Sequence, residues 1–184
     1  MIHDSLADVV ATPLPDGLIV RPFETGDAAR WLAIQSSTGI YDAIPGDLFE
    51  REFGDRPDGL PGRQLFARDT GGVDVATATA WYPEADRSAD MGRIHWVAVC
   101  PEVQRRGIGR ALTGIALERL RALGYRRAYL TTGAGNAAAV ALYLDVGFRP
   151  EPRRDAERPA WQALAKRLGL PRAERIDRVL RLRT

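Results

Sequence analysis

The fold of this chain is decided by the stretch Val97-Ala98-Val99-Cys100-Pro101-Glu102-Val103-Gln104-Arg105-Arg106-Gly107-Ile108-Gly109-Arg110-Ala111-Leu112. Its pattern predicts a strand, a short turn rich in arginine and glycine, and the start of an amphipathic helix. Such a turn directs several backbone N–H groups at one point, where the helix adds the positive end of its dipole. We expect a phosphate group there, because glycine at 107 and 109 would let an anion approach the backbone.

Two common phosphate-binding loops fit this stretch poorly. A P-loop requires lysine and then serine or threonine after its second glycine, whereas Gly109 is followed by Arg110 and Ala111. A dinucleotide fingerprint requires a small residue where Leu112 stands and an acidic residue about 20 positions later, where this chain has arginine. Neither loop is therefore the preferred interpretation.

Two segments together resemble a third kind of loop. Gln104–Gly109 matches the Q/R-x-x-G-x-G/A loop of the GNAT superfamily of N-acetyltransferases at every defined position, and Asn136–Phe148 resembles that superfamily's N-x-x-A-x-x-L-Y-x-x-x-G-F signature. The resemblance is strong over 92–149, weaker over 18–83, and fades after about 152. It implies an α+β (mixed α/β) GNAT acyltransferase fold, in which a central mixed, mostly antiparallel sheet is flanked by helices.

Composition agrees with a cytoplasmic globular protein. The chain has 184 residues, of which 45% are hydrophobic, so one domain with a core of normal size is expected. A net charge of only +2 does not call for nucleic acid. The single cysteine excludes an internal disulfide and suits a reducing compartment. We see no targeting signal and no apolar run of membrane-spanning length.

The hydrophobic pattern predicts the element order β-α-α-β-β-β-α-β-α-β, which is also the order in the superfamily. The predicted strands cover 18–23, 64–68, 73–81, 93–100 and 128–132, with a further strand beginning at Phe148. The predicted helices cover about 26–38 (capped by Thr25), 47–53, 106–123 and 136–146, with a Pro/Gly loop at 56–62.

The ends of the chain are expected to differ from its centre. Residues 1–16 are interpreted as a flexible leader, 17–152 as the GNAT N-acetyltransferase domain, and 153–184 as a C-terminal helical extension that could complete the domain. Residues 157–168 have a helical pattern. Residues 176–182 fit a last strand or a short helix equally well.

The resemblance implies acetyl-CoA as the cofactor. The arginine-glycine loop would bind its pyrophosphate through backbone N–H groups. The strand 93–100 would carry a bulge and splay from the next strand, which frees its main chain for the pantetheine arm and the acetyl carbonyl, with the N–H of Val97 nearest the oxyanion. The implied cofactor-binding residues are Val97, Val99, Gln104, Arg105, Arg106, Gly107, Ile108, Gly109, Arg110, Asn136 (also expected to cap its helix) and Tyr143. No metal site is predicted.

Three side chains are candidates for chemistry. Tyr143 is interpreted as a general acid, because a phenol of pKa ~10 can protonate a leaving thiolate whose thiol has pKa ~8.5; a core tyrosine is the alternative. His95 is the candidate base, because strand alternation places it on one face with Val97 and Val99; the alternative is a hydrogen-bonded structural histidine. Cys100 is expected to be a small buried residue at the strand end, and a covalent acetyl-cysteine route is the lesser alternative.

We therefore expect an acetyl-CoA-dependent N-acetyltransferase that moves an acetyl group to a primary amine, on a small molecule or peptide, by direct transfer in a ternary complex. The alternatives are a non-catalytic acyl-CoA-binding regulatory module on the same fold, or an acetyltransferase for protein N-termini or lysines. No nucleic-acid or membrane partner is expected, and a homodimer is conceivable. By resemblance, acceptor recognition falls to about 36–62 and 149–184, where Tyr41, Asp42, Asp47 and Glu50 would either receive a cationic amine or be ordinary solvated residues.

Overall fold

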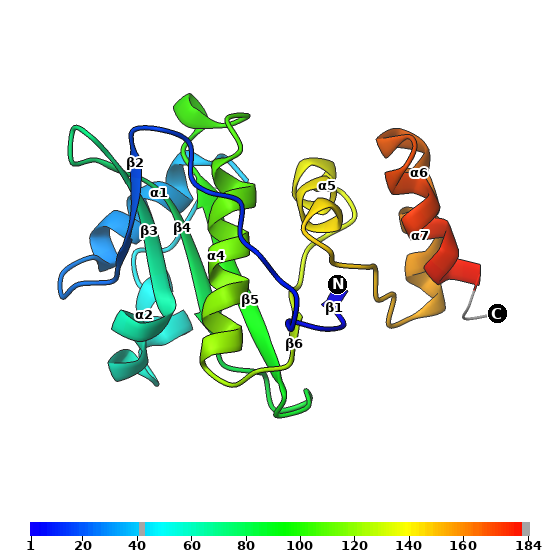
Figure 1. Ribbon diagram of the computed structural model, residues 1–184, viewed down its shortest axis with the longest axis horizontal. Helices are drawn as coiled ribbons and strands as arrows, with labels where there is room; N and C mark the ends of the chain where they lie inside the picture. Colours follow the sequence, from blue (N-terminus) through cyan, green and yellow to red (C-terminus); the bar gives the residue numbers. More distant parts are fainter. Residues whose placement is uncertain (41–42, 182–184) are drawn as a thin grey trace.

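The structure is a computed structural model that describes residues 1–40 and 43–181. Within these residues, six strands form one sheet in the order β1-β6-β5-β4-β3-β2 (Figure 1). All neighbouring strands are antiparallel except β5 and β6, which run parallel. The expected mixed, mostly antiparallel sheet is thus confirmed. The strands are β1 (Ile2–His3), β2 (Leu18–Pro22), β3 (Gln64–Asp69), β4 (Asp74–Trp81), β5 (Met91–Val99) and β6 (Arg127–Tyr129).

Helices cover both faces of this sheet. The longest, α4, lies on one face, while α1 and α2 lie on the other (Figure 1). Short 3-10 turns occur at 57–59, 101–103 and 155–157. The α-helices are α1 (Ala28–Ser37), α2 (Leu48–Phe53), α3 (Leu60–Arg63), α4 (Ile108–Ala122), α5 (Ala137–Asp145), α6 (Arg158–Leu168) and α7 (Arg172–Arg181).

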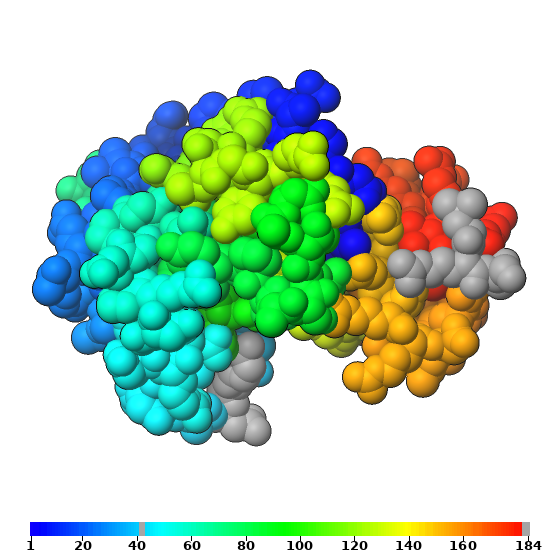
Figure 2. All heavy atoms as spheres, turned by 90° about the horizontal axis from the view of Figure 1, so that it is seen from below, coloured from blue at the N-terminus to red at the C-terminus, as the bar shows by residue number. Residues whose placement is uncertain are grey.

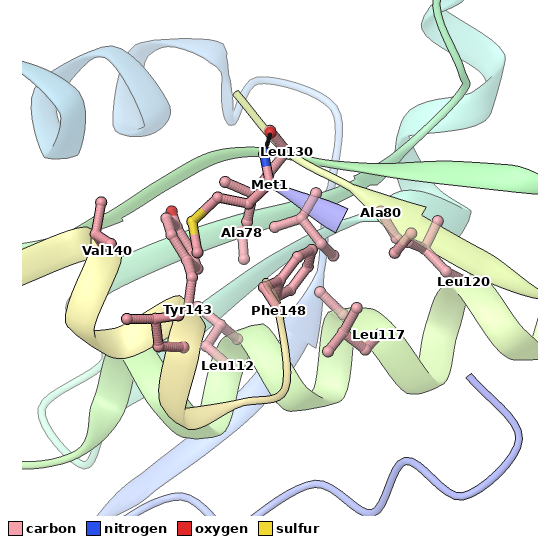
Figure 3. Close-up of a cluster of buried hydrophobic side chains, with 14 of the residues drawn as sticks. Met1, Ala78, Ala80, Leu112, Leu117, Leu120, Leu130, Val140, Tyr143 and Phe148 are labelled. Atoms are coloured by element: carbon pink, nitrogen blue, oxygen red, sulfur yellow. Dashed lines mark hydrogen bonds between the residues drawn. The ribbon is translucent and has the colours of Figure 1, made fainter. Parts of the chain in front are cut away.

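Helix α4 connects the two parallel strands, as a parallel pair requires. Its buried stripe includes Ile108, Leu112 and Leu120, which recur at the helical period and pack on the alanine-rich face of β3 and β4. Gly92 of β5 permits this close approach, because a Cβ there would collide with Leu120. Figure 3 shows the resulting core, in which side chains of α4, α5 and the N-terminal segment meet.

The opposite face is covered by an aromatic cluster. Phe53 of α2 is fully buried, with ring centroids 5.4 Å from Trp31 of α1 and 5.0 Å from Trp81 of β4, both edge to face. This packing fixes α2 against the sheet. It therefore also fixes Glu52, the residue before Phe53.

The start of α1 differs from the prediction. The helix begins after Asp27, no side chain caps it, and Thr25 is not its N-cap. The fully buried Asp27 carboxylate instead accepts bonds from the backbone N–H of Glu24 at 2.7 Å and from the buried Arg21 at 2.5 Å. Arg21 also binds Asp74 of β4, so an ionic network joins β2, α1 and β4.

The N-terminal segment is packed, not loose as expected. Strand β1 pairs antiparallel with β6, the Met1 nitrogen donates to the Leu130 carbonyl at 2.8 Å, and Leu6 is fully buried. The strand expected to begin at Phe148 does not form. Because β1 occupies that edge of the sheet, Phe148 packs in the core and Arg149 makes only an isolated bridge to Ile2.

The C-terminal segment forms a helix pair. Residues 176–181, within the region that fitted a strand or a helix, are helical, because α7 buries Ile176, Val179 and Leu180 at helical spacing. Helices α6 and α7 pack on α5, which lies between them and α4 (Figure 1). The predicted loop at 56–62 contains the turn at 57–59 and the start of α3. None of the helices in the described residues is both long and apolar enough to span a membrane.

Candidate active site and cofactor groove

Strand β5 contains a bulge at Trp96. Thr77 of β4 pairs with Ala98 and Thr79 pairs with His95, so two steps along β4 correspond to three along β5. The backbone of Trp96 has φ +50, in the left-handed region. One extra residue therefore lies in β5, as expected of a bulged strand.

The bulge reverses the alternation of side chains along β5. His95 lies against Phe53 on the α1–α2 face, with ring centroids 5.8 Å apart, whereas Val97 and Val99 pack with the core on the α4 face. The expectation that His95 shares a face with these valines is therefore wrong. The extra residue is the physical reason, since a one-residue shift moves every later side chain to the other face.

The parallel strands separate beyond the bulge. Pairing of β5 with β6 ends at Arg93 and Tyr129. Strand β5 nevertheless continues to Val99, and the segment Leu130–Thr132 follows β6. A groove of about 830 Å³ opens at this point and reaches both faces of the sheet, since Val97, Val99, His95 and Trp96 all line it. The groove is completed by the loop before α4, the segment Leu130–Thr132, helix α5 and the end of α1. In Figure 2 the molecular surface is hollowed between the cyan segment around α2 and the orange segment around α6.

The N-terminus of α4 opens on this groove without a side-chain cap. Ala111 is the first residue whose amide donates within the helix, to the Gly107 carbonyl at 3.0 Å, so the amides of Ile108, Gly109 and Arg110 have no intrahelical acceptor. Gly107 has φ +86, and a Cβ there would point into open space. Arg105 also has φ +65, which produces the concave backbone typical of anion-binding nests. These features fit the pyrophosphate of acetyl-CoA.

The two loop glycines have different roles. A Cβ on Gly109 would lie 2.9 Å from Leu142 Cδ1 and 3.5 Å from Val99 Cγ2. Gly109 therefore allows α4 to pack against α5 and β5, and the expectation that it frees space for the anion applies to Gly107 alone. The side-chain amide of Gln104 donates through Nε2 to the Val99 carbonyl at 2.9 Å and connects the loop to β5.

The loop arginines are not equivalent. Arg105 and Arg110 line the groove, whereas Arg106 is exposed and is not among its lining residues. Arg110 binds Asp145 at the end of α5 at 2.6 Å, and Arg172 of α7 binds the same carboxylate at 2.7 Å. The sequence analysis missed both Asp145 and Arg172. Only a fold that brings α7 to the end of α5 places them together.

Helix α5 carries the two residues expected from the second motif. Asn136 caps it, since its Oδ1 accepts a bond from the Ala139 amide at 3.1 Å, which confirms the predicted cap. Tyr143 lines the groove and is 9% exposed. Its ring packs edge to face on Phe148 with centroids 5.9 Å apart (Figure 3). Contacts of either residue with a cofactor stay predictions.

His95 is held by a carboxylate from another element. Its Nε2 lies 2.9 Å from Oε2 of Glu52, which also accepts a bond from the Trp96 indole at 2.9 Å. The hydrogen bond from His95 lowers the pKa of Glu52 to about 2, helped by the Trp96 indole and opposed by burial. Burial lowers the pKa of His95 below its ordinary value, although Glu52 partly opposes this. The imidazole is therefore neutral near pH 7.

Sequence reasoning singled out Glu50 but not Glu52. A signal for Glu52 exists in the pattern of α2, where Leu48, Phe49 and Phe53 are buried. Because Glu52 stands four residues after Leu48 and just before Phe53, it lies on the stripe that turns toward the sheet. An acidic residue on a buried stripe is uncommon and marks a paired or functional group.

The other candidates lie away from the groove or outside the described residues. Asp47 and Glu50 are exposed and do not line it, while Tyr41 and Asp42 fall outside the described residues. Cys100 is half-buried beside Ser37, whose hydroxyl donates to its sulfur at 3.6 Å, and it does not line the groove.

Comparison with known proteins agrees with this geometry. The family model described as "Acetyltransferase (GNAT) family" matches residues 28–148. This chain belongs to the GNAT acetyltransferase family. Among solved structures, this GNAT chain is similar to a GCN5-related N-acetyltransferase from Sphaerobacter thermophilus, with 25% identity, a TM-score of 0.60, and coverage of 79% of this chain and 46% of that one. It shares its fold with a diaminobutyrate acetyltransferase from Paenibacillus lautus, solved with L-2,4-diaminobutyric acid and coenzyme A, with 21% identity, a TM-score of 0.58, and coverage of 70% and 73%.

Curated relatives of this GNAT chain are named mycothiol acetyltransferases. The protein from Pseudarthrobacter chlorophenolicus is 33% identical over 147 residues, which cover 77% of this chain and 46% of the relative. The protein from Kocuria rhizophila is 35% identical over 144 residues, which cover 73% and 47%. The GNAT chain thus spans about half the length of the curated relatives it matches.

Proposed function

We propose that the protein is an acetyl-CoA-dependent N-acetyltransferase that acetylates a primary amine by direct transfer in a ternary complex. One observation carries the proposal: the uncapped N-terminus of α4 opens on a groove that passes between the separated strands β5 and β6. An anion-binding helix end and a passage through the sheet provide a place for a long phosphorylated thioester and for an acceptor at its reactive end.

The chain's own groups divide the work of binding. The amides at the start of α4 would hold the pyrophosphate, with Arg105 adding positive charge. The main chain of Val97 and Val99, on the unpaired side of β5, would hold the pantetheine arm and the acetyl carbonyl. Acetyl-CoA, when bound, supplies the activated acetyl thioester. A backbone N–H directed at the carbonyl oxygen stabilises negative charge that develops there.

His95 is proposed to accept the proton of the amine. The Glu52 carboxylate is ionised and can only accept, so Nε2 of His95 must donate to it, and the second nitrogen Nδ1 is left as the base. An alkylammonium with a pKa of ~10.4 must lose a proton to such an acceptor before its nitrogen can attack the thioester. Glu52 orients the ring and stabilises the imidazolium that forms, which makes it a positioning residue.

Tyr143 is proposed to protonate the departing thiolate. It lines the groove from α5 next to Leu142, the residue that packs closely on Gly109 of the arginine-glycine loop. A phenol can donate to a thiolate of lower basicity without large cost. His95 and Tyr143 come from different elements that line the groove, β5 and α5, so the acceptor amine and the leaving thiolate would each have a separate proton-transfer group.

An acetyl-CoA consumption assay across a panel of amines tests the proposal. The panel includes polyamines, aminoglycosides, amino acids, amino sugars, peptides and the acceptor of mycothiol acetyltransferases. Turnover with at least one amine, together with a rise in melting temperature on adding acetyl-CoA, is the expected result. A thermal rise without turnover would favour a regulatory acyl-CoA-binding module, and turnover only with peptides would favour a protein acetyltransferase. The absence of any thermal rise contradicts all three functions.

A further inference from the structure

Arg93 lies in the groove beside the proposed base. It stands on β5 two residues before His95, opposite Trp81 of β4 and Tyr129 of β6. Neither residue is part of the bulge, so both side chains face the α1–α2 side of the sheet. A rise of about 3.4 Å per residue places their attachment points roughly 7 Å apart.

The guanidinium of Arg93 is only partly used within the protein. Its NH1 forms an ion pair with Oε1 of Glu84 at 2.9 Å, while its Nε is buried and has no hydrogen-bond partner among the described residues. The side chain is 19% exposed. Because buried polar groups are nearly always paired, this fork of donors is suited to an acceptor that enters the groove.

The charges that line the groove point to the sign of that acceptor. Its described lining residues include four arginines: Arg93, Arg105, Arg110 and Arg172. Asp145 is the only carboxylate among those described residues, and it already binds two of these arginines. A groove of this kind favours anionic ligands and opposes polycations.

We propose that the acceptor is a primary amine bearing a carboxylate or phosphate a few bonds from its nitrogen. This inference rests on the proposed acetyltransferase function. Arg93 binds that anionic group while the amine lies beside His95. Arginine is suited to the task because its planar fork matches both anions with two parallel hydrogen bonds. Arg93 is then the residue that determines acceptor specificity.

Matched pairs of amines test this inference. The first pair is an α-amino acid and its amide, and the second is an amino sugar phosphate and the unphosphorylated sugar. The wild type should show kcat/KM at least about 10-fold higher for the anionic member of one pair, which also tells a carboxylate from a phosphate. Arg93→Met should reduce this preference to about 3-fold or less. Arg126→Met, at a side chain that is 82% exposed, should keep it.

A second variant should act in the opposite direction. Glu84→Gln removes the partner that competes for Arg93 and should increase the preference for the anionic amine several-fold. Calorimetry with saturating coenzyme A gives a readout without turnover: the anionic member should bind more tightly to wild type than to Arg93→Met. Preference for the neutral amines, an equal loss for both members in Arg93→Met, or no anion-dependent binding or turnover overturns the inference. Turnover of neutral amines alone would overturn it and still leave the acetyltransferase proposal intact.

Discussion

The imidazole of His95 and the carboxylate of Glu52 lie 2.9 Å apart although 43 positions separate them in the chain. Two elements bring them together: the aromatic cluster fixes α2 on the sheet, and β5 passes beneath it. The same carboxylate oxygen accepts from the Trp96 indole, so one glutamate holds both the candidate base and the bulged residue next to it. The contact therefore couples the geometry of the bulge to the protonation of His95.

His95→Gln should lower kcat/KM by about 10²–10⁴-fold, because glutamine cannot take up the amine proton. In the wild type, burial lowers the pKa of His95, so its neutral form is lost only below the ordinary histidine value of about 6.5. The value of kcat/KM should accordingly increase with pH over a range below 6.5, as His95 loses its proton. Near pH 7 it should no longer change because of His95. The variant should lack this increase while its melting temperature still rises with acetyl-CoA. An identical pH profile in both proteins would remove His95 from the mechanism.

Glu52→Gln should move this increase in kcat/KM to lower pH, because Glu52 is the group that keeps the pKa of His95 from falling further. The pH–rate profile is the measurement, and a purely structural role would not shift it. A stability readout follows as well. The pKa of Glu52 is lowered from 4.5 to about 2, so its contribution is complete above 4.5 and is lost as the pH falls toward 2. Wild type should therefore lose more stability than Glu52→Gln across that window, and equal losses would contradict the assignment.

Gly107→Glu should abolish the rise in melting temperature that acetyl-CoA causes, because it places bulk and negative charge at the uncapped helix end. Gly124→Glu is a matched control. Gly124 follows the other end of α4 and has φ +90 with open space at its Cβ, against φ +86 at Gly107. Both substitutions should cost about 1–2 kcal/mol from backbone strain. Differential scanning calorimetry with and without acetyl-CoA separates the shared strain from the specific loss of binding.

Tyr143→Phe should keep acetyl-CoA affinity and lower kcat, on the order of 10²–10⁴-fold if proton delivery limits the reaction. Tyr125→Phe provides the comparison, because Tyr125 is half-buried and does not line the groove. Steady-state kinetics and a cofactor titration on both variants are the measurements. If the two variants keep the same kcat as wild type, Tyr143 is a core residue and not the general acid.

Asp27→Asn should destabilise the fold by about 3 kcal/mol without altering the groove, because it removes one of the two carboxylates that bind the buried Arg21. Burial alone would raise the pKa of Asp27, but bonds from Arg21, Glu24 and Arg30 bring it down to about 2. Asp55→Asn is the control, since the Asp55 side chain is 74% exposed and its ion pair with Arg56 spans 3.7 Å. That change should cost less than about 1 kcal/mol. Denaturant unfolding measures both.

Local patterns predicted the centre of the chain well. The helices around Leu112 and Leu144 were expected within about two residues of their observed bounds, because apolar periodicity and the glycines that follow them are local signals. The N-terminal strand was missed because its pairing with β6 joins segments more than 120 positions apart, as the Met1–Leu130 bond shows. The Arg172–Asp145 contact spans only 27 positions, but it depends on how α7 packs against α5, which no local pattern indicates.

The bulge was expected from the family resemblance, but its effect on His95 was not. The segment Arg93–Val99 contains no glycine, proline or asparagine, so its sequence does not indicate where the alternation of side chains breaks. The position is set by packing, since Trp96 must reach both Trp31, at 5.3 Å between centroids, and Glu52. On a bulged strand, the face on which a side chain lies is set by its tertiary partners, and counting alternate residues does not predict it.

The extra residue in β5 has a consequence for how this protein can change. Removing Trp96 would restore regular pairing with β4, because His95 would still lie opposite Thr79 and Ala98 opposite Thr77, so Val97 and Val99 would stay on the α4 side. The strand would instead lose the side chain that packs on Trp31 and donates to Glu52 beside the groove. A one-residue deletion at the bulge would therefore leave the core in register and change only the contacts around Glu52, so the bulged residue serves the edge of the groove and not the packing of the sheet.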